Sequence, residues 1–148
     1  MSFTFKDHTS QFENAFDNAI EQGLTAVGLA AEGHAKREIT KLVYSRGNND
    51  KKYRLTGRLR NSITFAIGGK RANKSSYSDN DGNTYTYSGT APVDKEPSVY
   101  IGSNVEYAPF VENGTSKMVA RPFLKPAASG HGDEYERIMK AALKNSDR

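Results

Sequence analysis

The sequence predicts an α+β fold, and three of its features support this class. An apolar series with helical spacing fills much of the first third of the chain. A shorter helical series lies near the end, and runs that alternate apolar with polar residues stand between the two. With 148 residues, the chain is expected to form a single domain over residues 1–148. The arrangement expected is a long N-terminal helix and a C-terminal helix packed on a small antiparallel sheet, with a projecting polar hairpin arm.

The long helix is predicted over residues 9–43. Its apolar residues recur with a period of about 3.75, close to the helical 3.6. They are Phe12, Phe16, Ile20, Leu24, Val27, Ala31, Ala35, Ile39 and Leu42. Thr9 or Ser10 is expected to cap its start, since Glu13 stands three residues after Ser10 as in a capping box. Because the period exceeds 3.6, the stripe should drift around the helix, which is therefore expected to curve, break or meet different neighbours along its length.

Three glycines interrupt this helix at intervals of five residues, at Gly23, Gly28 and Gly33. Each costs about 1 kcal/mol relative to alanine inside a helix. At that spacing they do not share one face, so a common packing seam is not expected. They are interpreted as kinks or as places where a neighbouring subunit comes close.

A short helix and a strand are predicted over residues 56–69. Thr56 is expected to be the N-cap of the short helix. Ile63, Phe65 and Ile67 alternate with other residues before Gly68, which is typical of a strand.

Residues 70–97 are predicted to form a flexible arm or hairpin. Asp81-Gly82, the favoured two-residue hairpin turn, lies between polar stretches that carry Tyr77 and Tyr85. Such an arm has no apolar face, so it is expected to project and to become ordered only against a partner.

Residues 98–127 are predicted to hold further strands and a motif-bearing loop. Val99, Ile101 and Val105 are expected in a strand pair, and Asn113-Gly114 is expected to be a turn with positive φ. The C-terminal helix is predicted over residues 133–145, with Asp133 as its N-cap. Its apolar positions are Tyr135, Ile138, Met139 and Ala142.

Composition argues against several classes of function. The chain has no cysteine, which removes disulfides and thiolate chemistry, and it lacks a signal peptide pattern or a membrane-spanning run. His8, His34 and His131 stand on different segments without metal-ligand spacing. The expectation is therefore a protein of the cytoplasm that is not an enzyme, with no catalytic residue, no metal and no cofactor.

Positive charge is concentrated in residues 44–74, which carry nine Lys and Arg against the single acidic residue Asp50. The block indicates an anionic partner or a solvated loop. Lys51, Lys52 and Arg54 are the candidates to face DNA, by contacts with phosphates. An alternative function is thus non-specific nucleic-acid binding, although the sequence contains no module that recognises bases.

Thr56–Ile63, Val105–Thr115 and Ala120–Ala127 are three short stretches that, in this order and spacing, together resemble a known family, the small minor tail components of tailed bacteriophages that act as neck or tail-completion proteins. Thr56-Gly57-Arg58-Leu59-Arg60-Asn61-Ser62-Ile63 is similar to its "T-G-x-L-R-x-S-I" pattern. The stretch from Val105 to Thr115 is similar to "V-x-Y-A-x-x-V-E-x-G-T", with Tyr107, Ala108, Val111, Glu112, Gly114 and Thr115 at the matching positions. The stretch from Ala120 to Ala127 is similar to "A-R-P-F-L-x-P-A", with Pro122, Phe123 and Pro126.

The resemblance implies a structural virion protein that forms a ring at the junction of head and tail, or completes the tail. Its partners would be copies of itself, connector or head-completion proteins, tail tube or tail terminator proteins, and passing genomic DNA without sequence specificity. It would reside in the neck or tail of the virion, and in the host cytoplasm during assembly. Two features depart from the family, the longer arm at residues 70–97 and the Ser-Gly-His-Gly stretch at residues 129–132.

Two roles are expected for charged residues of these stretches. Glu112 would accept hydrogen bonds from backbone amides or pair with a neighbouring arginine. Arg58 or Arg60 would contact an acidic group of the next subunit, which carries Glu106 and Glu112. Lys51, Lys52 and Arg54 would stay solvated or face the channel. Since residues two apart on a helix point different ways, one arginine of the pair should be structural and the other exposed.

Overall fold

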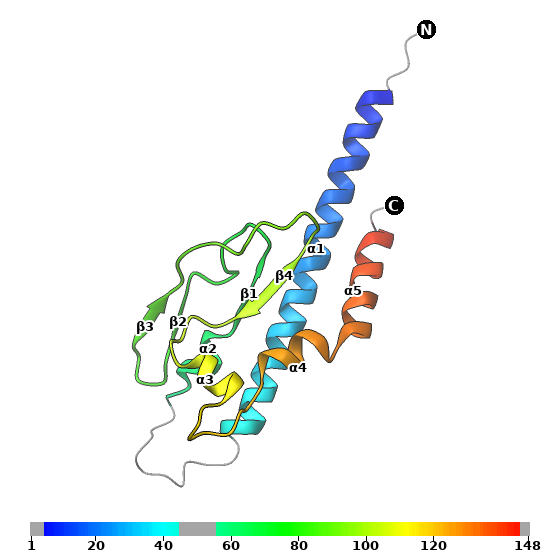
Figure 1. Ribbon diagram of the computed structural model, residues 1–148. Coiled ribbons are helices and arrows are strands. Elements are labelled where there is room, and N and C mark those ends of the chain that lie inside the picture. Colours follow the sequence, from blue (N-terminus) through cyan, green and yellow to red (C-terminus); the bar gives the residue numbers. More distant parts are fainter. Residues whose placement is uncertain (1–4, 45–55, 146–148) are drawn as a thin grey trace.

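The computed structural model describes residues 5–44 and 56–145, with side chains from residue 14 to 43 and from 56 onward, and it has the predicted α+β fold (Figure 1). The helices and strands, in chain order, are α1 (Phe5–Ile39), a π-helical turn η1 (Thr40–Tyr44), α2 (Arg58–Ser62), β1 (Thr64–Ile67), β2 (Ser76–Ser78), β3 (Thr84–Thr86), β4 (Val99–Gly102), α3 (Ala108–Asn113), α4 (Leu124–Ser129) and α5 (Gly132–Asn145). Helix α1 runs through the centre, with α5 along one side and the β1–β4 sheet along the other (Figure 1). Among the described residues, none of the helices is long and apolar enough to cross a membrane.

Helix α1 is exposed at residues 14–18 and has buried side chains from Ala19 onward, most of them in its second half. Ala31, Ala35 and Ile39, which recur at intervals of four, are at most 4% exposed and face the core. The helix begins at Phe5, so the expected cap at Thr9 or Ser10 is wrong, and both residues lie inside the helix. The drifting stripe does meet different neighbours, namely α5, the β1–β4 sheet and α4, and the helix ends in the wider η1 turn.

The helix glycines make room for segments of the same chain. A Cβ on Gly23 would lie 2.7 Å from Met139 of α5, and one on Gly28 would lie 2.1 Å from the Phe65 ring of β1. The two glycines therefore face different elements, as their spacing predicts. One interpretation of these glycines was the close approach of a neighbouring subunit. At Gly23 and Gly28 the segment that comes close belongs to the same chain.

The main sheet pairs β1 with β4 in antiparallel register, with Phe65 opposite Ile101 and Ile67 opposite Val99. The predicted strand at Ile63–Ile67 is confirmed, and Phe65 is buried against α1. The expected pairing between Val99–Ile101 and Val105 is wrong. Val105 is buried but lies outside the described strands, because the partner of β4 comes from about 35 residues earlier in the chain.

Strands β2 and β3 form the predicted hairpin, but it is not an arm without a packing face. Tyr77 is 7% exposed and belongs to the core, and its ring lies 5.2 Å from that of Tyr85 and 5.3 Å from that of Tyr87. Aromatic rings bury enough apolar surface to replace the missing aliphatic residues. The sequence interpretation failed because it counted aliphatic residues and treated tyrosine as polar.

The hairpin loop is also longer than the expected two-residue Asp-Gly turn. The last ladder pair is Ser78 with Thr84, and the Asp79 N–H then donates to the Asn83 carbonyl at 3.0 Å. The Asp79 carboxylate accepts from the backbone amides of Asp81 and Asn83, both at 2.9 Å. Although burial alone would raise the pKa of Asp79, these bonds and one from the Asn83 side chain hold it below its ordinary value.

The C-terminal third returns to α1 through two short helices and α5. Phe123 and Ala127 are fully buried in the core beside Ile39. Helix α5 begins at Gly132, so Asp133 lies in its first turn rather than at its N-cap. Met139 of α5 faces Gly23, as its place in the predicted apolar series requires.

Candidate functional site

The three stretches that resemble the phage family lie together at one end of the core. The first forms α2, the second forms α3 and its flanks, and the third leads into α4. Leu59, Ala108 and Phe123, one from each stretch, are all less than 5% exposed and belong to the same core cluster. We call this assembly of residues 56–63, 105–115 and 120–127 the motif cluster.

The first stretch turns sharply before α2. Gly57 has a φ of +75°, in the left-handed region, and a Cβ there would also meet Asn80 at 3.1 Å. The N-cap of α2 is Gly57, so the expected N-cap at Thr56 is wrong by one residue; the Thr56 hydroxyl accepts from the Arg58 amide at 3.3 Å. Ser62 is buried and donates to the Leu59 carbonyl at 2.6 Å.

Arg58 links the first stretch to the second within one chain. Its guanidinium donates to both carboxylate oxygens of Glu106, at 3.2 and 3.1 Å, and lies 4.1 Å from the centroid of the Tyr85 ring. The pKa of Glu106 is lowered, because its own backbone N–H and then Arg58 stabilise the carboxylate. The contact expected between Arg58 or Arg60 and an acidic group of the next subunit stays a prediction, but Glu106 already binds Arg58 of its own chain. A chain that folds back makes the same pair internally.

Arg60, two residues later, is half-buried. One of the two arginines was expected to be structural and the other exposed. Arg58 is the structural one, with a side chain that is 21% exposed, but Arg60 is only half-exposed.

Glu112 links the second stretch to the third. Its carboxylate accepts from the backbone amides of Phe123, Leu124 and Lys125 at 2.8, 2.9 and 2.9 Å. These amides begin α4, where unpaired N–H groups attract a negative charge. Of the two expected roles, Glu112 thus has the first, as an acceptor from backbone amides.

The second stretch ends in the predicted glycine turn. Gly114 has a φ of +77°, and a Cβ would lie 2.7 Å from the backbone nitrogen of Ala120. Thr115 donates its amide to the Met118 carbonyl at 2.8 Å, and Arg121 donates its amide to the Val111 carbonyl at 2.8 Å. The loop between the second and third stretches therefore folds back on α3.

Several residues of the motif cluster face outward. Tyr107 is 39% exposed and Phe110 is 55% exposed, so these large side chains leave apolar surface available on α3. Pro122 is exposed as well, whereas Pro126 is half-buried. The candidate DNA-facing residues, Lys51, Lys52 and Arg54, lie outside the described residues.

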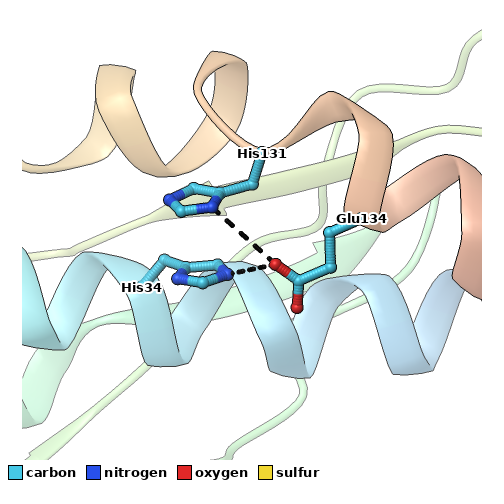
Figure 2. Close-up of side chains that lie close together, drawn as sticks. All are labelled: His34, His131 and Glu134. Carbon is cyan, nitrogen blue, oxygen red and sulfur yellow. Dashed lines mark hydrogen bonds and ion pairs between the residues drawn. The ribbon is translucent and has the colours of Figure 1, made fainter.

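A second group of polar residues was not foreseen. His34 of α1 and His131, just before α5, stack with ring centroids 3.5 Å apart, and Glu134 approaches both (Figure 2). His34 and His131 lie on different segments, but the packing of α5 along α1 brings them together. The sequence did offer one pattern, His131-x-x-Glu134 at the start of a helix, where positions three apart share a face.

No protein-family model, no curated protein and no solved structure matches this chain. The motif cluster and the histidine pair are therefore the features of the described residues that bear most directly on function.

Proposed function

We propose that the chain is a structural virion protein of a tailed bacteriophage, which forms a ring at the head–tail junction or completes the tail so that it joins the capsid connector. It would assemble in the host cytoplasm and remain in the neck or tail of the virion. The role is binding rather than catalysis, so no residue is assigned to a reaction.

The main support is that the three matching stretches contact one another. Arg58 of the first binds Glu106 of the second, and Glu112 of the second binds the amides that follow Pro122 in the third. Chance matches scattered over 70 residues of sequence have no reason to meet in space. Arg58 and Glu106 stand at positions that the patterns leave open, whereas Glu112 occupies a matching position and its carboxylate holds backbone amides of the third stretch, which is what a shared structural motif requires.

Further support comes from the first half of α1. A 35-residue helix is about 52 Å long, and its N-terminal turns extend beyond α5 and the sheet (Figure 1). Residues 14–18 are all exposed, including Phe16 at 41%, and the first buried side chain described is Ala19. A projecting helix with apolar side chains at helical spacing suits contact with the next copy in a ring, where head-to-tail contacts close the assembly.

Light scattering coupled to size exclusion tests this, on the protein alone over a concentration series and then mixed with connector and tail proteins encoded beside it. We expect a closed oligomer in at least one of these conditions. Phe16→Asp should weaken it, whereas Asn18→Asp, which adds the same charge on the opposite face of the same turn, should not. A monomer under all conditions would contradict the proposal.

The same experiments distinguish the nucleic-acid alternative. If the chain is an independent DNA-binding protein, the monomer should bind duplex DNA tightly at physiological salt, with an affinity that falls steeply as salt rises. Changing Lys51, Lys52 and Arg54 together to Glu would then abolish binding. If the proposal is right, that triple variant should form the oligomer as the wild type does.

A further inference from the structure

Three ligand-bearing side chains meet where the start of α5 packs on the middle of α1. The Nε2 atom of His34 lies 2.7 Å from Glu134 Oε2, and His131 Nδ1 lies 3.7 Å from the same oxygen (Figure 2). One ligand atom from each residue lies within 4.8 Å of the other two.

From this geometry we propose that His34, His131 and Glu134 form a binding site for a divalent transition-metal ion, with Zn²⁺ as its best-suited occupant. Two imidazole nitrogens and one carboxylate oxygen are a ligand set that zinc accepts, whereas Ca²⁺ and Mg²⁺ prefer oxygen ligands alone. All three residues are partly exposed, so water could occupy the fourth position of a tetrahedral zinc ion.

Small movements complete the site. Ligands of one tetrahedral zinc at about 2.0–2.1 Å lie roughly 3.3 Å from each other. The contact between His34 and Glu134 must therefore widen slightly, and that between His131 and Glu134 must shorten. The stacked rings are nearly parallel, at 6°, so one ring must rotate before both nitrogens point at the same ion. His131 is suited to rotate, because its side chain is 36% exposed and glycines flank it on both sides.

Arg37, as it lies in the structure, disfavours metal binding by His34. Its guanidinium lies 2.7 Å from His34 Nδ1, and since arginine only donates, Nδ1 must be the acceptor. Neutral His34 then carries its proton on Nε2, facing Glu134. Zinc at Nε2 requires that this proton transfer through solvent to Nδ1, which would face a cation until Arg37 turns away. An acceptor at the position of Arg37 would instead stabilise the metal-bound tautomer.

Metal binding would attach α5 to α1. None of the residues of α5, all of which are described, is buried, so a metal ion that joins α5 to α1 would add to the stability of this packing. The ion would join residue 34 to residues 131 and 134 and hold the first turn of α5 in place. This inference is independent of the proposed role in virion assembly.

The test is calorimetric titration of Zn²⁺ into the chelator-treated full chain at pH 7.5, with thermal unfolding and Co²⁺ absorption as second measurements. We expect one ion per chain, tetrahedral Co²⁺ bands, and about a hundredfold rise in the folded-to-unfolded ratio when free Zn²⁺ is a hundred times Kd. His131→Gln and Glu134→Gln should each weaken binding at least tenfold, and Arg37→Gln should tighten it. His8→Gln, which removes a histidine elsewhere on α1, serves as the matched control.

The proposal is wrong if the wild type takes up no Zn²⁺, or if both His131→Gln and Glu134→Gln bind it as well as the wild type does. Unchanged or weaker binding by Arg37→Gln would overturn the assignment of Nε2 as the ligand atom. Circular dichroism in excess chelator establishes that each variant is folded before its titration, and two independent ligand variants guard against the failure of either one to fold.

Discussion

Replacing Glu112 with alanine should strongly destabilise the protein. The substitution leaves three amides at the start of α4 without their acceptor, of which those of Phe123 and Leu124 are part-buried and that of Lys125 is exposed. Each part-buried amide without a partner costs about 1–2 kcal/mol, and loss of the negative charge at the helix start adds about 0.5 kcal/mol. The exposed amide binds water instead. The sum is about 3 kcal/mol.

Urea unfolding followed by circular dichroism measures this cost. With a slope of about 2 kcal/mol per molar urea, the midpoint should fall by about 1.5 M. Glu112→Gln keeps an oxygen that accepts hydrogen bonds but loses the charge, so it should lie between alanine and wild type. The exposed Glu96, changed to alanine, controls for loss of a glutamate and should stay within about 0.5 kcal/mol of wild type. A Glu112→Ala midpoint indistinguishable from that of this control would refute the assigned role.

Three further predictions concern stability measured in the same way. Gly28→Ala should destabilise the protein by about 1–3 kcal/mol, because the added Cβ has no room beside the Phe65 ring of β1. Gly33→Ala, whose Cβ meets only the flexible Arg37 side chain, should stabilise it by up to about 1 kcal/mol. Equal effects of the two substitutions would show that Gly28 does not lie in close contact with Phe65. Arg58→Ala should destabilise the fold more than Glu106→Gln does. The glutamate change removes only a solvent-screened ion pair, whereas the arginine change also removes the contacts with the Tyr85 and Tyr107 rings. The reverse order would contradict this. The lowered pKa of Asp79 means that its charge stabilises the fold above the unfolded-state pKa of about 3.9, and that this contribution is lost as pH falls through the folded-state pKa. The urea midpoints of Asp79→Asn and wild type should therefore differ at pH 7 and converge as the pH falls below about 4. A difference that does not change with pH would exclude the carboxylate as the cause.

The motif cluster shows how far local pattern determines contacts. The turn at Gly114 was predicted, because positive φ is a property of the residue and its immediate neighbours, whereas the positive φ of Gly57 was not foreseen. The partner of Glu112 was one of two alternatives, since the sequence does not show which amides a carboxylate reaches. Arg58 or Arg60 was expected to contact an acidic group of a neighbouring subunit, and the fold places Glu106 of the same chain beside Arg58. Charge complementarity predicts that such a pair forms, but not between which copies of the chain.

What the sequence alone determined are the features that depend on a few successive residues. The period of the apolar series predicted α1 and α5, and the alternation at Ile63–Ile67 predicted β1, because side-chain direction follows directly from local backbone geometry.

Only the tertiary structure decided which distant segments meet. The pairing of β1 with β4, the burial of Tyr77 and the stacking of His34 on His131 all bring together segments that are far apart in the chain. Such contacts depend on how α1 receives the sheet on one side and α5 on the other, with Gly28 and Gly23 setting the distances of approach. No periodicity within either segment carries that information, because the free energy that selects the pairing belongs to the packed core as a whole.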